Sequence, residues 1–253
     1  MSERSTTTRI ALVTGAAQGI GEAIAARLAA DGLALALADL APRERTAEVA
    51  ARLADAHGVA ARAYQVHVRD AAACRRVVDE VTADFGGLDV LVNNAGINAR
   101  GDTVELPEST WLTVMDTNLN GTYRMSVAAY QALRDRRGVV VNLASTAGLI
   151  AVKGSAAYAV SKAGIIHLTR VLALEWAGVG VRVNAVGPTI VPTAMTADVR
   201  DNPDYMRDKL ASIPMGRMVG TTDVAEAVAW LASPAAGMVT GQTLFVDGGA
   251  TII

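Results

Sequence analysis

Two residues with acid–base chemistry, Tyr158 and Lys162, stand four positions apart in the apolar, alanine-rich run SAAYAVSK. On a helix this spacing puts both side chains on one face, so they can act on one point. A free phenol, with a pKa of about 10, is a poor base at neutral pH, but a nearby ammonium favours the phenolate. The pair is therefore a candidate acid–base group. On its own, however, the segment YAVSK at residues 158–162 fits a half-buried tyrosine beside a solvated lysine better.

A glycine-rich segment near the start of the chain, TGAAQGIG at residues 14–21, continues the apolar run IALVTG. Its glycines Gly15, Gly19 and Gly21 allow a tight turn and let the backbone approach a pyrophosphate, whose charge suits the N-terminus of the following helix. Because the segment has the strand–turn–helix context at the first crossover, a nucleotide site is a better interpretation than a simple tight turn.

Asp39 ends the second apolar run, eighteen residues after Gly21. A carboxylate there would accept hydrogen bonds from the adenosine ribose hydroxyls and repel a 2′-phosphate, so the sequence favours NAD over NADP. Two observations keep alternatives open. Arg43 and Arg45 follow closely and could pair with a phosphate, and an aspartate after a strand can simply start a turn.

Two further segments end predicted strands at the edge where ligands bind in open α/β sheets. The small residues of NNAG, residues 93–96, let a flat group lie close. Ser145 ends the next strand, thirteen residues before Tyr158, so both side chains can converge on one substrate oxygen. Considered alone, a serine at such a position is more often a helix cap or a loop residue.

Apolar β-type runs alternate with longer helical patterns along the chain. We expect strands at residues 10–15, 33–39, 61–68, 88–96, 138–145, 181–188 and 242–249, and helices from about Gly19 and Arg43, over residues 74–86, 109–133 and 223–234, and around Tyr158. This alternation predicts an α/β fold: a doubly wound, Rossmann-type parallel sheet with helices on both faces. We expect the chain to form a single domain at residues 9–253 after a polar tail at residues 1–8. Within this domain, residues 188–222 are expected to form a substrate loop.

The composition restricts the possible partners. The chain has 253 residues, 51% of them hydrophobic, with a net charge of −2 and no block of Lys and Arg. We therefore expect a small-molecule substrate and neither nucleic acid nor membrane as a partner. A single cysteine predicts no internal disulfide and fits a reducing compartment, and only three histidines predict no metal site. No apolar stretch reaches the roughly 18 residues of a membrane span, so we expect a cytoplasmic location.

The ordered set of motifs resembles the short-chain dehydrogenase/reductase family, in its small single-domain subgroup, over residues 8–250. The matching features are TGAAQGIG, Asp39, NNAG, Asn118 in NLNG, Ser145, YAVSK and Thr193 after GPTIVP. The resemblance implies that Tyr158 is the acid/base, that Ser145 hydrogen-bonds the substrate oxygen, and that Lys162 holds the nicotinamide ribose and lowers the tyrosine pKa. Asn118 would complete a water-linked proton path, and the family's assembly implies a homotetramer or a dimer.

The same resemblance implies a set of cofactor-binding residues. They are Gly15, Gln18, Gly19, Ile20, Gly21, Asp39, Val68, Asn94, Ala95, Gly96, Tyr158, Lys162, Pro188, Thr189, Val191 and Thr193. Two positions depart from the family pattern: His67 stands where an aspartate is usual near the adenine, and Thr189 replaces a glycine. The sequence GPT around Thr189 is similar to that of the family's sugar-alcohol and xylulose-reducing members.

Besides Ser145, three residues are candidate substrate contacts. Arg100 lies just past NNAG and Lys153 lies five residues before Tyr158, so both would suit a carboxylated or sulfonated sugar at the mouth of the cleft. Isolated charges on loops are, however, usually solvated. Met195 in the long loop offers adaptable apolar surface, which would equally suit a larger hydrophobic alcohol.

The sequence thus predicts an NAD-dependent oxidoreductase that interconverts a secondary alcohol and a ketone by hydride transfer, on a polyol or sugar-derived substrate. The main alternative is a 3-oxoacyl thioester reductase, against which Asp39 argues because that reduction usually draws on NADP. A steroid or cyclic-ketone dehydrogenase comes next. A dinucleotide-binding regulator without turnover belongs to a different class, and an intact Ser145, Tyr158 and Lys162 argue against it.

Overall fold

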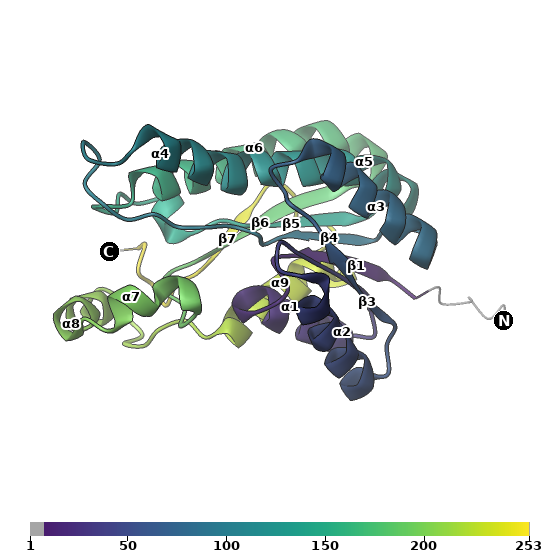
Figure 1. The fold of residues 1–253 in the computed structure, drawn as a ribbon, viewed down its shortest axis with the longest axis horizontal. Coiled ribbons are helices and arrows are strands. Elements are labelled where there is room, and N and C mark those ends of the chain that lie inside the picture. Colours follow the sequence, from purple (N-terminus) through teal and green to yellow (C-terminus); the bar gives the residue numbers. More distant parts are fainter. Residues whose placement is uncertain (1–7, 253) are drawn as a thin grey trace.

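A seven-stranded parallel sheet forms the centre of the molecule (Figure 1). The computed structural model describes residues 8–252, so the predicted polar tail lies outside the described residues except for Thr8. The strands are β1 (Ile10–Thr14), β2 (Ala34–Asp39), β3 (Ala61–Gln65), β4 (Val90–Asn93), β5 (Val139–Leu143), β6 (Arg182–Pro188) and β7 (Thr243–Val246). Their order is β3-β2-β1-β4-β5-β6-β7, and all neighbours are parallel. The predicted fold class is confirmed.

The strand order reverses next to β1. This strand pairs with β2 on one side, where Ala11 lies opposite Leu35, and with β4 on the other, where Ala11 lies opposite Val90. In open α/β sheets ligands bind at such a switch point, beyond the carboxyl ends of the strands. The residues that follow β1, β2 and β4 are therefore brought to one place.

Helices cover both faces of the sheet (Figure 1). One face carries α1 (Gly19–Ala30), α2 (Arg43–His57) and α9 (Thr221–Ala232), and the other carries α3 (Ala71–Phe85), α4 (Glu108–Met115), α5 (Gly121–Arg136) and α6 (Ala156–Trp176). Strand side chains alternate between the faces, so Val13 joins the core under α1 and α9 while Leu12 joins the core under α3 and α5. Burial on both faces explains why the strands read as continuous apolar runs.

Local signals fix the ends of α3. The Asp70 carboxylate accepts hydrogen bonds from the N–H groups of Ala72 (2.7 Å) and Ala73 (3.2 Å), which would otherwise be unpaired at the helix start. Gly86 ends the helix in the left-handed conformation, with φ at 79°, which costs glycine little. The helix expected at residues 74–86 therefore begins slightly earlier, at Ala71.

The helical region expected at residues 109–133 is present but interrupted. α4 leads into a π-helical turn, η1 (Asp116–Asn120), and α5 follows directly. A π turn accommodates an extra residue, and such turns often occur at functional sites. Here the turn contains the candidate residue Asn118, whose side chain is fully buried.

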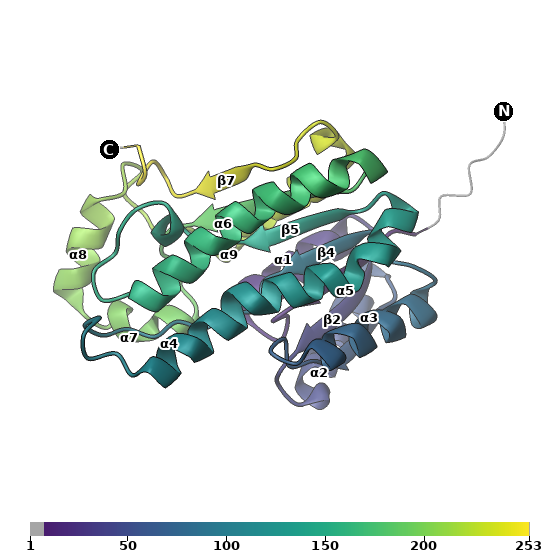
Figure 2. The same ribbon diagram turned by 90° about the horizontal axis from the view of Figure 1, so that it is seen from above.

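The segment at residues 188–222 contains two short helices, α7 (Ala197–Arg200) and α8 (Pro203–Ala211). Asn202 caps α8, because its side-chain oxygen accepts a hydrogen bond from the Tyr205 N–H (3.0 Å). Figure 2 shows α7 and α8 beyond the carboxyl ends of the strands, at the same end of the molecule as α4. Within residues 8–252, no helix combines the length and the apolar character needed to span a membrane.

Candidate active site

The loop between β1 and α1 turns tightly around the N-terminus of α1. Gly15 and Gly19 adopt left-handed φ values of 66° and 62°, and a Cβ atom at Gly21 would collide with the carbonyl oxygen of Gly15. Because Gly15 and Gly19 carry no side chain, a ligand can approach the backbone N–H groups and the positive end of the helix dipole. The loop therefore fits the pyrophosphate of a dinucleotide.

Asn94 ties this loop to the end of β4. Its side-chain amide donates hydrogen bonds to the carbonyl oxygens of Thr14 (3.0 Å) and Gly15 (2.9 Å). In return, the Thr14 hydroxyl accepts hydrogen bonds from the N–H groups of Asn94 and Ala95, both at 3.1 Å. The NNAG segment and the glycine-rich loop are thus held together as one wall.

A pocket of about 450 Å³ opens along this wall. Most of the predicted cofactor residues line it, namely Gly15, Gln18, Gly19, Ile20, Asp39, Val68, Asn94, Ala95, Gly96 and Thr193. Met195, a candidate substrate contact, lines it too. Six predicted cofactor residues do not line it: the half-buried Tyr158 and the buried Gly21, Lys162, Pro188, Thr189 and Val191.

Asp39 ends β2 at the rim of this pocket with both carboxylate oxygens engaged. One oxygen accepts a hydrogen bond from the N–H of Ala17 in the glycine-rich loop, and the other accepts from Ala41, each at 2.9 Å. A carboxylate oxygen accepts more than one hydrogen bond, so ribose hydroxyls can still bind. Asp39 therefore both starts a turn, the alternative weighed above, and presents a negative charge to the pocket.

The opposite rim is formed by the start of the 188–222 segment. A Cβ atom at Gly19 would lie 3.5 Å from the Thr193 side chain, so Thr193 covers the glycine-rich loop. Arg200 on α7 donates a hydrogen bond to the Thr193 carbonyl oxygen at 3.2 Å, and the Thr193 N–H donates to the Thr196 hydroxyl at 3.3 Å. These contacts hold Thr193 over the pocket.

The candidate acid–base residues lie together beside the pocket. Tyr158 and Lys162 share one face of α6, with the Lys162 Nζ 5.5 Å from the centre of the tyrosine ring. Ser145 follows β5, and its hydroxyl faces the Tyr158 phenol closely enough to lower the phenol pKa through a hydrogen bond. Ser145 also caps the short turn after β5 by accepting a hydrogen bond from Ala147 (3.2 Å). The structure therefore brings Ser145, Tyr158 and Lys162 together.

Burial controls the acidity of this group. Desolvation raises the pKa of Tyr158 above its ordinary value, and the Ser145 hydrogen bond and the charge of Arg100 oppose this shift. Burial also lowers the pKa of Lys162 to about 8. The resemblance implied that Lys162 lowers the tyrosine pKa. In the protein without cofactor the tyrosine pKa is raised, because desolvation is the largest effect. A lowering contribution from Lys162 stays a prediction.

Gly96 links the acid–base group to the pocket. A Cβ atom at this pocket residue would lie 3.2 Å from the Asn118 side-chain oxygen and 3.8 Å from the Lys162 Nζ. Asn118 is fixed by three hydrogen bonds: from the Ile97 N–H (2.8 Å), to the Ile97 carbonyl oxygen (2.9 Å) and to the Ser161 hydroxyl (3.0 Å). Asn118 and Lys162 thus lie directly behind the pocket wall.

Comparison with known proteins decides the family. The chain is 41% identical to a 3-oxoacyl-acyl-carrier-protein reductase from Staphylococcus aureus, over 96% of this chain and 98% of that protein. It is 40% identical to a D-threitol dehydrogenase from Mycolicibacterium smegmatis, over 96% and 93%. A family model described as enoyl-(acyl carrier protein) reductase matches residues 15–251. The chain belongs to the short-chain dehydrogenase/reductase family.

Solved structures agree with this assignment. A short-chain type dehydrogenase/reductase from Mycobacterium marinum superimposes with a TM-score of 0.91 at 30% identity, covering 98% of this chain and 97% of that one. A gluconate 5-dehydrogenase from Burkholderia cenocepacia, in complex with NADP and tartrate, gives a TM-score of 0.94 at 33% identity, covering 97% and 96%. This short-chain dehydrogenase/reductase is accordingly an oxidoreductase that acts on CH–OH groups with a nicotinamide dinucleotide.

The two charged candidate substrate contacts differ in this short-chain dehydrogenase/reductase. Arg100 forms an ion pair with Asp198 on α7, at 3.3 Å, and its charge lowers the Tyr158 pKa. Lys153 is exposed and has no ion pair among residues 8–252. Arg100 therefore interacts both with α7 and with the acid–base group. Lys153 fits the alternative of a solvated charge on a loop.

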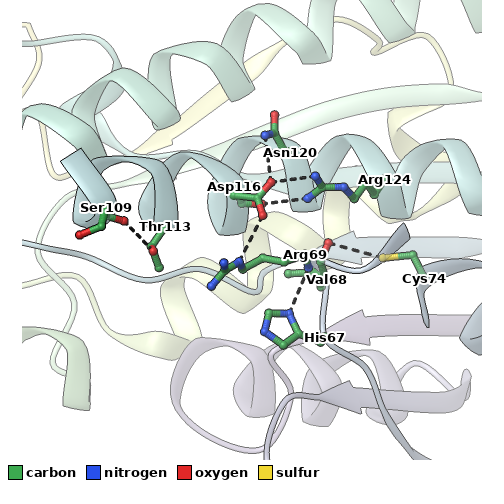
Figure 3. A network of polar contacts seen from close by, with 9 residues as sticks. All are labelled: His67, Val68, Arg69, Cys74, Ser109, Thr113, Asp116, Asn120 and Arg124. Carbon is green, nitrogen blue, oxygen red and sulfur yellow. Dashed lines mark hydrogen bonds and ion pairs between the residues drawn. The ribbon is translucent and has the colours of Figure 1, made fainter. Parts of the chain in front are cut away.

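A polar network at the far end of the pocket could not be recognised from the sequence (Figure 3). Asp116 pairs with Arg124 (2.7 Å) on α5 and with Arg69 (3.2 Å), and it accepts a hydrogen bond from Asn120 (3.1 Å). Arg69 and Thr113 line the pocket. The spacing of Asp116, Asn120 and Arg124 is a helical signal, but nothing in the sequence joins them to Arg69.

Proposed function

We propose that this chain is an NAD-dependent enzyme that interconverts a secondary alcohol and a ketone. The observation that carries the proposal is the grouping of Ser145, Tyr158 and Lys162, in which the Lys162 Nζ lies directly behind Gly96, a wall residue of the pocket. A protein that only binds a dinucleotide has no need of an acid–base pair at this position. A regulator without turnover is therefore the weaker alternative.

In the proposed reaction, Ser145 and Tyr158 hold the substrate oxygen between their hydroxyl groups. A nicotinamide bound in the pocket supplies the hydride acceptor for oxidation or the hydride donor for reduction. During oxidation the Tyr158 phenolate takes the proton of the substrate hydroxyl. The Ser145 hydroxyl donates a hydrogen bond to the charge that develops on the oxygen. In the reverse direction the Tyr158 phenol returns the proton.

Lys162 and Asn118 support this exchange. The Lys162 ammonium has three N–H donors, and one is used by the Leu143 carbonyl oxygen at 2.6 Å. Its other donors are available to hydroxyls of the nicotinamide ribose. We assign Asn118 to a water-linked proton path because its side-chain oxygen lies beside Gly96, close to the Lys162 ammonium.

The proposed preference for NAD rests on Asp39. Its carboxylate lines the pocket and would repel a 2′-phosphate. The arginines that could offset it have other partners: Arg43 donates to the Ala63 carbonyl oxygen (3.0 Å) and Arg45 donates to the Gln18 side chain (2.9 Å). We propose that the remaining buried cofactor residues act by supporting the residues that line the pocket. They are Gly21, Pro188, Thr189 and Val191.

We infer that the substrate is a polyol or a sugar-derived alcohol. A D-threitol dehydrogenase and a gluconate 5-dehydrogenase are among the similar proteins. The Arg100–Asp198 ion pair is near enough to Tyr158 for its arginine to lower the phenol pKa, and the apolar Met195 lines the pocket, a mixture that suits a hydroxylated chain. In this proposal residues 188–222, with α7 and α8, form the substrate loop.

A second candidate is the reduction of a 3-oxoacyl thioester. The 41% identity to a 3-oxoacyl-acyl-carrier-protein reductase favours it, and the acid–base group would serve that reaction equally. Met195 on the pocket lining, 42% exposed, would contact an acyl chain. The choice of cofactor separates the candidates, because Asp39 opposes NADP.

The test is reduced-nicotinamide absorbance with purified protein, NAD or NADP, and a panel of polyols, sugar acids, cyclic alcohols and hydroxyacyl thioesters. We expect turnover of a polyol or sugar with NAD, and turnover about 10²–10⁴-fold slower in Tyr158→Phe. Turnover confined to thioesters with NADP would establish the second candidate. Dinucleotide binding without turnover of any substrate would favour the regulator.

We also propose that the chain forms a homotetramer, with a dimer as the alternative. One group of exposed apolar side chains stands on α4, α5 and α6 and includes Leu112, Tyr123, Val127 and Leu174, which are 56%, 51%, 48% and 83% exposed. A second group includes Trp230, Met238 and Leu244, on or near α9 and β7. Two groups on different elements suit two different contacts between copies. Light scattering of the purified protein gives the subunit number directly.

A further inference from the structure

The pocket continues past Asp39 to the carboxyl end of the neighbouring strand β3. Asp39 lies opposite Gln65 in the β2–β3 register, and His67 follows two residues beyond Gln65. Neighbouring strands are about 4.8 Å apart, so His67 stands one strand over from Asp39 and two residues further along the chain direction. It lines the pocket, as do Leu40 and Arg69. With the pyrophosphate at α1 and the ribose at Asp39, as proposed above, the purine base falls at this end.

A hydrogen bond determines which group His67 offers to that base. The Arg69 N–H donates to the His67 Nδ1 at 3.2 Å, as Figure 3 shows. Because Nδ1 accepts, the proton of the imidazole is on Nε2, which is then a donor. Among residues 8–252 nothing accepts a hydrogen bond from Nε2, and the His67 side chain is exposed at the pocket. His67 therefore presents a donor and no acceptor.

The network around Arg69 keeps the histidine in this arrangement. The Arg69 side chain is held by its ion pair with Asp116, which is itself paired with Arg124 on α5. The backbone N–H that orients the His67 ring belongs to the same Arg69. The ring is thus oriented by Arg69, and its Nε2 edge is left for a ligand.

We propose that the His67 Nε2 donates a hydrogen bond to the purine base of the dinucleotide, so that this enzyme accepts 6-oxopurine and 6-aminopurine dinucleotides alike. A donor pairs with N7, which accepts in adenine and in hypoxanthine alike, and O6 of hypoxanthine on the same edge is a further acceptor. It gives no advantage to the 6-amino group of adenine, which is itself a donor. An acceptor at this position would instead select adenine. The inference rests on the proposed use of a nicotinamide dinucleotide.

The test compares the binding of NADH with that of reduced nicotinamide hypoxanthine dinucleotide, by fluorescence titration of the full chain. For the wild-type protein we expect the dissociation constants of the two dinucleotides to agree within about threefold, which is a smaller difference than the loss of one hydrogen bond would cause. His67→Asp replaces the donor with an acceptor and should shift the ratio toward adenine by about fivefold to tenfold. His67→Ala should weaken both dinucleotides equally. Gln65→Asp, which adds a carboxylate at an exposed residue outside the pocket lining, should leave the ratio unchanged.

Three results would overturn the proposal: a wild-type preference for adenine above about tenfold, an unchanged ratio in His67→Asp, or the same shift in Gln65→Asp. Failure of the proposed function would look different. In that case the wild-type protein would bind neither dinucleotide, or would bind both without turning over any alcohol, and only the former result would also overturn the role of His67.

Discussion

Lys162 lies across the ring of Tyr158, with its Nζ 5.5 Å from the ring centre, and its shortest hydrogen bond goes to the Leu143 carbonyl oxygen at 2.6 Å. The ammonium is therefore over the ring, and in the proposed reaction the phenol oxygen meets Ser145 and the substrate. Lys162 acts on proton transfer through its charge and through what it holds in place, without taking the proton itself.

The first prediction concerns the phenol. Tyr158→Phe removes the only group in the proposed reaction that exchanges a proton with the substrate, so kcat should fall by about 10²–10⁴-fold. The Kd for NADH should be unchanged, because the phenyl ring keeps the shape of the site. Tyr123→Phe, at a 51% exposed tyrosine on α5, is the matched control. Steady-state kinetics and a fluorescence titration measure both quantities, and a Tyr158→Phe enzyme with ordinary kcat would refute the assignment.

The second prediction concerns the stability of the protein without cofactor. Burial lowers the pKa of Lys162 from 10.5 to about 8. Above pH 8 the unfolded chain therefore binds more protons than the folded protein, and the free energy of unfolding should rise with pH. This rise should end near pH 10. Burial raises the pKa of Tyr158 in the folded protein, so above pH 10 the phenol loses its proton more readily in the unfolded chain, and this favours unfolding.

Lys162→Met tests this directly. Because the burial penalty disappears with the charge, the free energy of unfolding at pH 7 should increase by about 1–3 kcal/mol. Its pH dependence between pH 8 and pH 10 should flatten, and turnover should be lost. Urea denaturation at pH 7 and pH 9.5 measures these changes. A variant that is less stable than the wild type at pH 7 would show that the hydrogen bond to Leu143 outweighs the burial.

Much of this site could be predicted because it depends on local spacing. The four-residue step from Tyr158 to Lys162 fixes a shared helix face wherever the helix lies. Ser145 could be placed near them because the carboxyl ends of parallel strands meet at one edge. The glycine-rich loop needed only its strand–turn–helix context. Each of these predictions requires no knowledge of how distant side chains pack.

Other features depend on such packing and could not be predicted. The Arg100–Asp198 ion pair joins the loop after β4 to α7, far away in the sequence. The π turn that presents Asn118 gives the same sequence signal as a continuous helix. The short helices α7 and α8 are below the length at which helices form on their own, so tertiary contacts must hold them. The raised pKa of Tyr158 reflects burial by several elements together.

The third prediction concerns cofactor choice. Asp39→Ala would remove the repulsion of a 2′-phosphate, but it would also remove the acceptor of the Ala17 N–H. Asp39→Asn is the sharper variant, because it removes the charge and keeps an acceptor oxygen. The ratio of kcat/KM for NADP to that for NAD should rise by about tenfold or more. Asp55→Asn removes a carboxylate from an exposed position on α2 and should change nothing. An unchanged ratio in Asp39→Asn would remove the support for NAD.

The fourth prediction concerns Arg100. If its guanidinium binds a carboxylated substrate, Arg100→Ala should raise KM for a sugar acid such as gluconate by about tenfold or more, and leave KM for a neutral polyol such as threitol unchanged. Asp198→Asn should have the opposite effect on the sugar acid, because it frees Arg100 from the ion pair. Lys153→Ala, at an exposed lysine, is the control and should affect neither substrate.

A second readout separates this binding role from a purely structural one. The charge of Arg100 lowers the Tyr158 pKa, so Arg100→Ala should move the rise of the alcohol oxidation rate to higher pH even with a neutral polyol. A loss of substrate loop structure would instead lower activity at every pH, without moving the profile. Equal KM increases for gluconate and threitol, with an unmoved pH profile, would show that Arg100 only anchors α7 through Asp198.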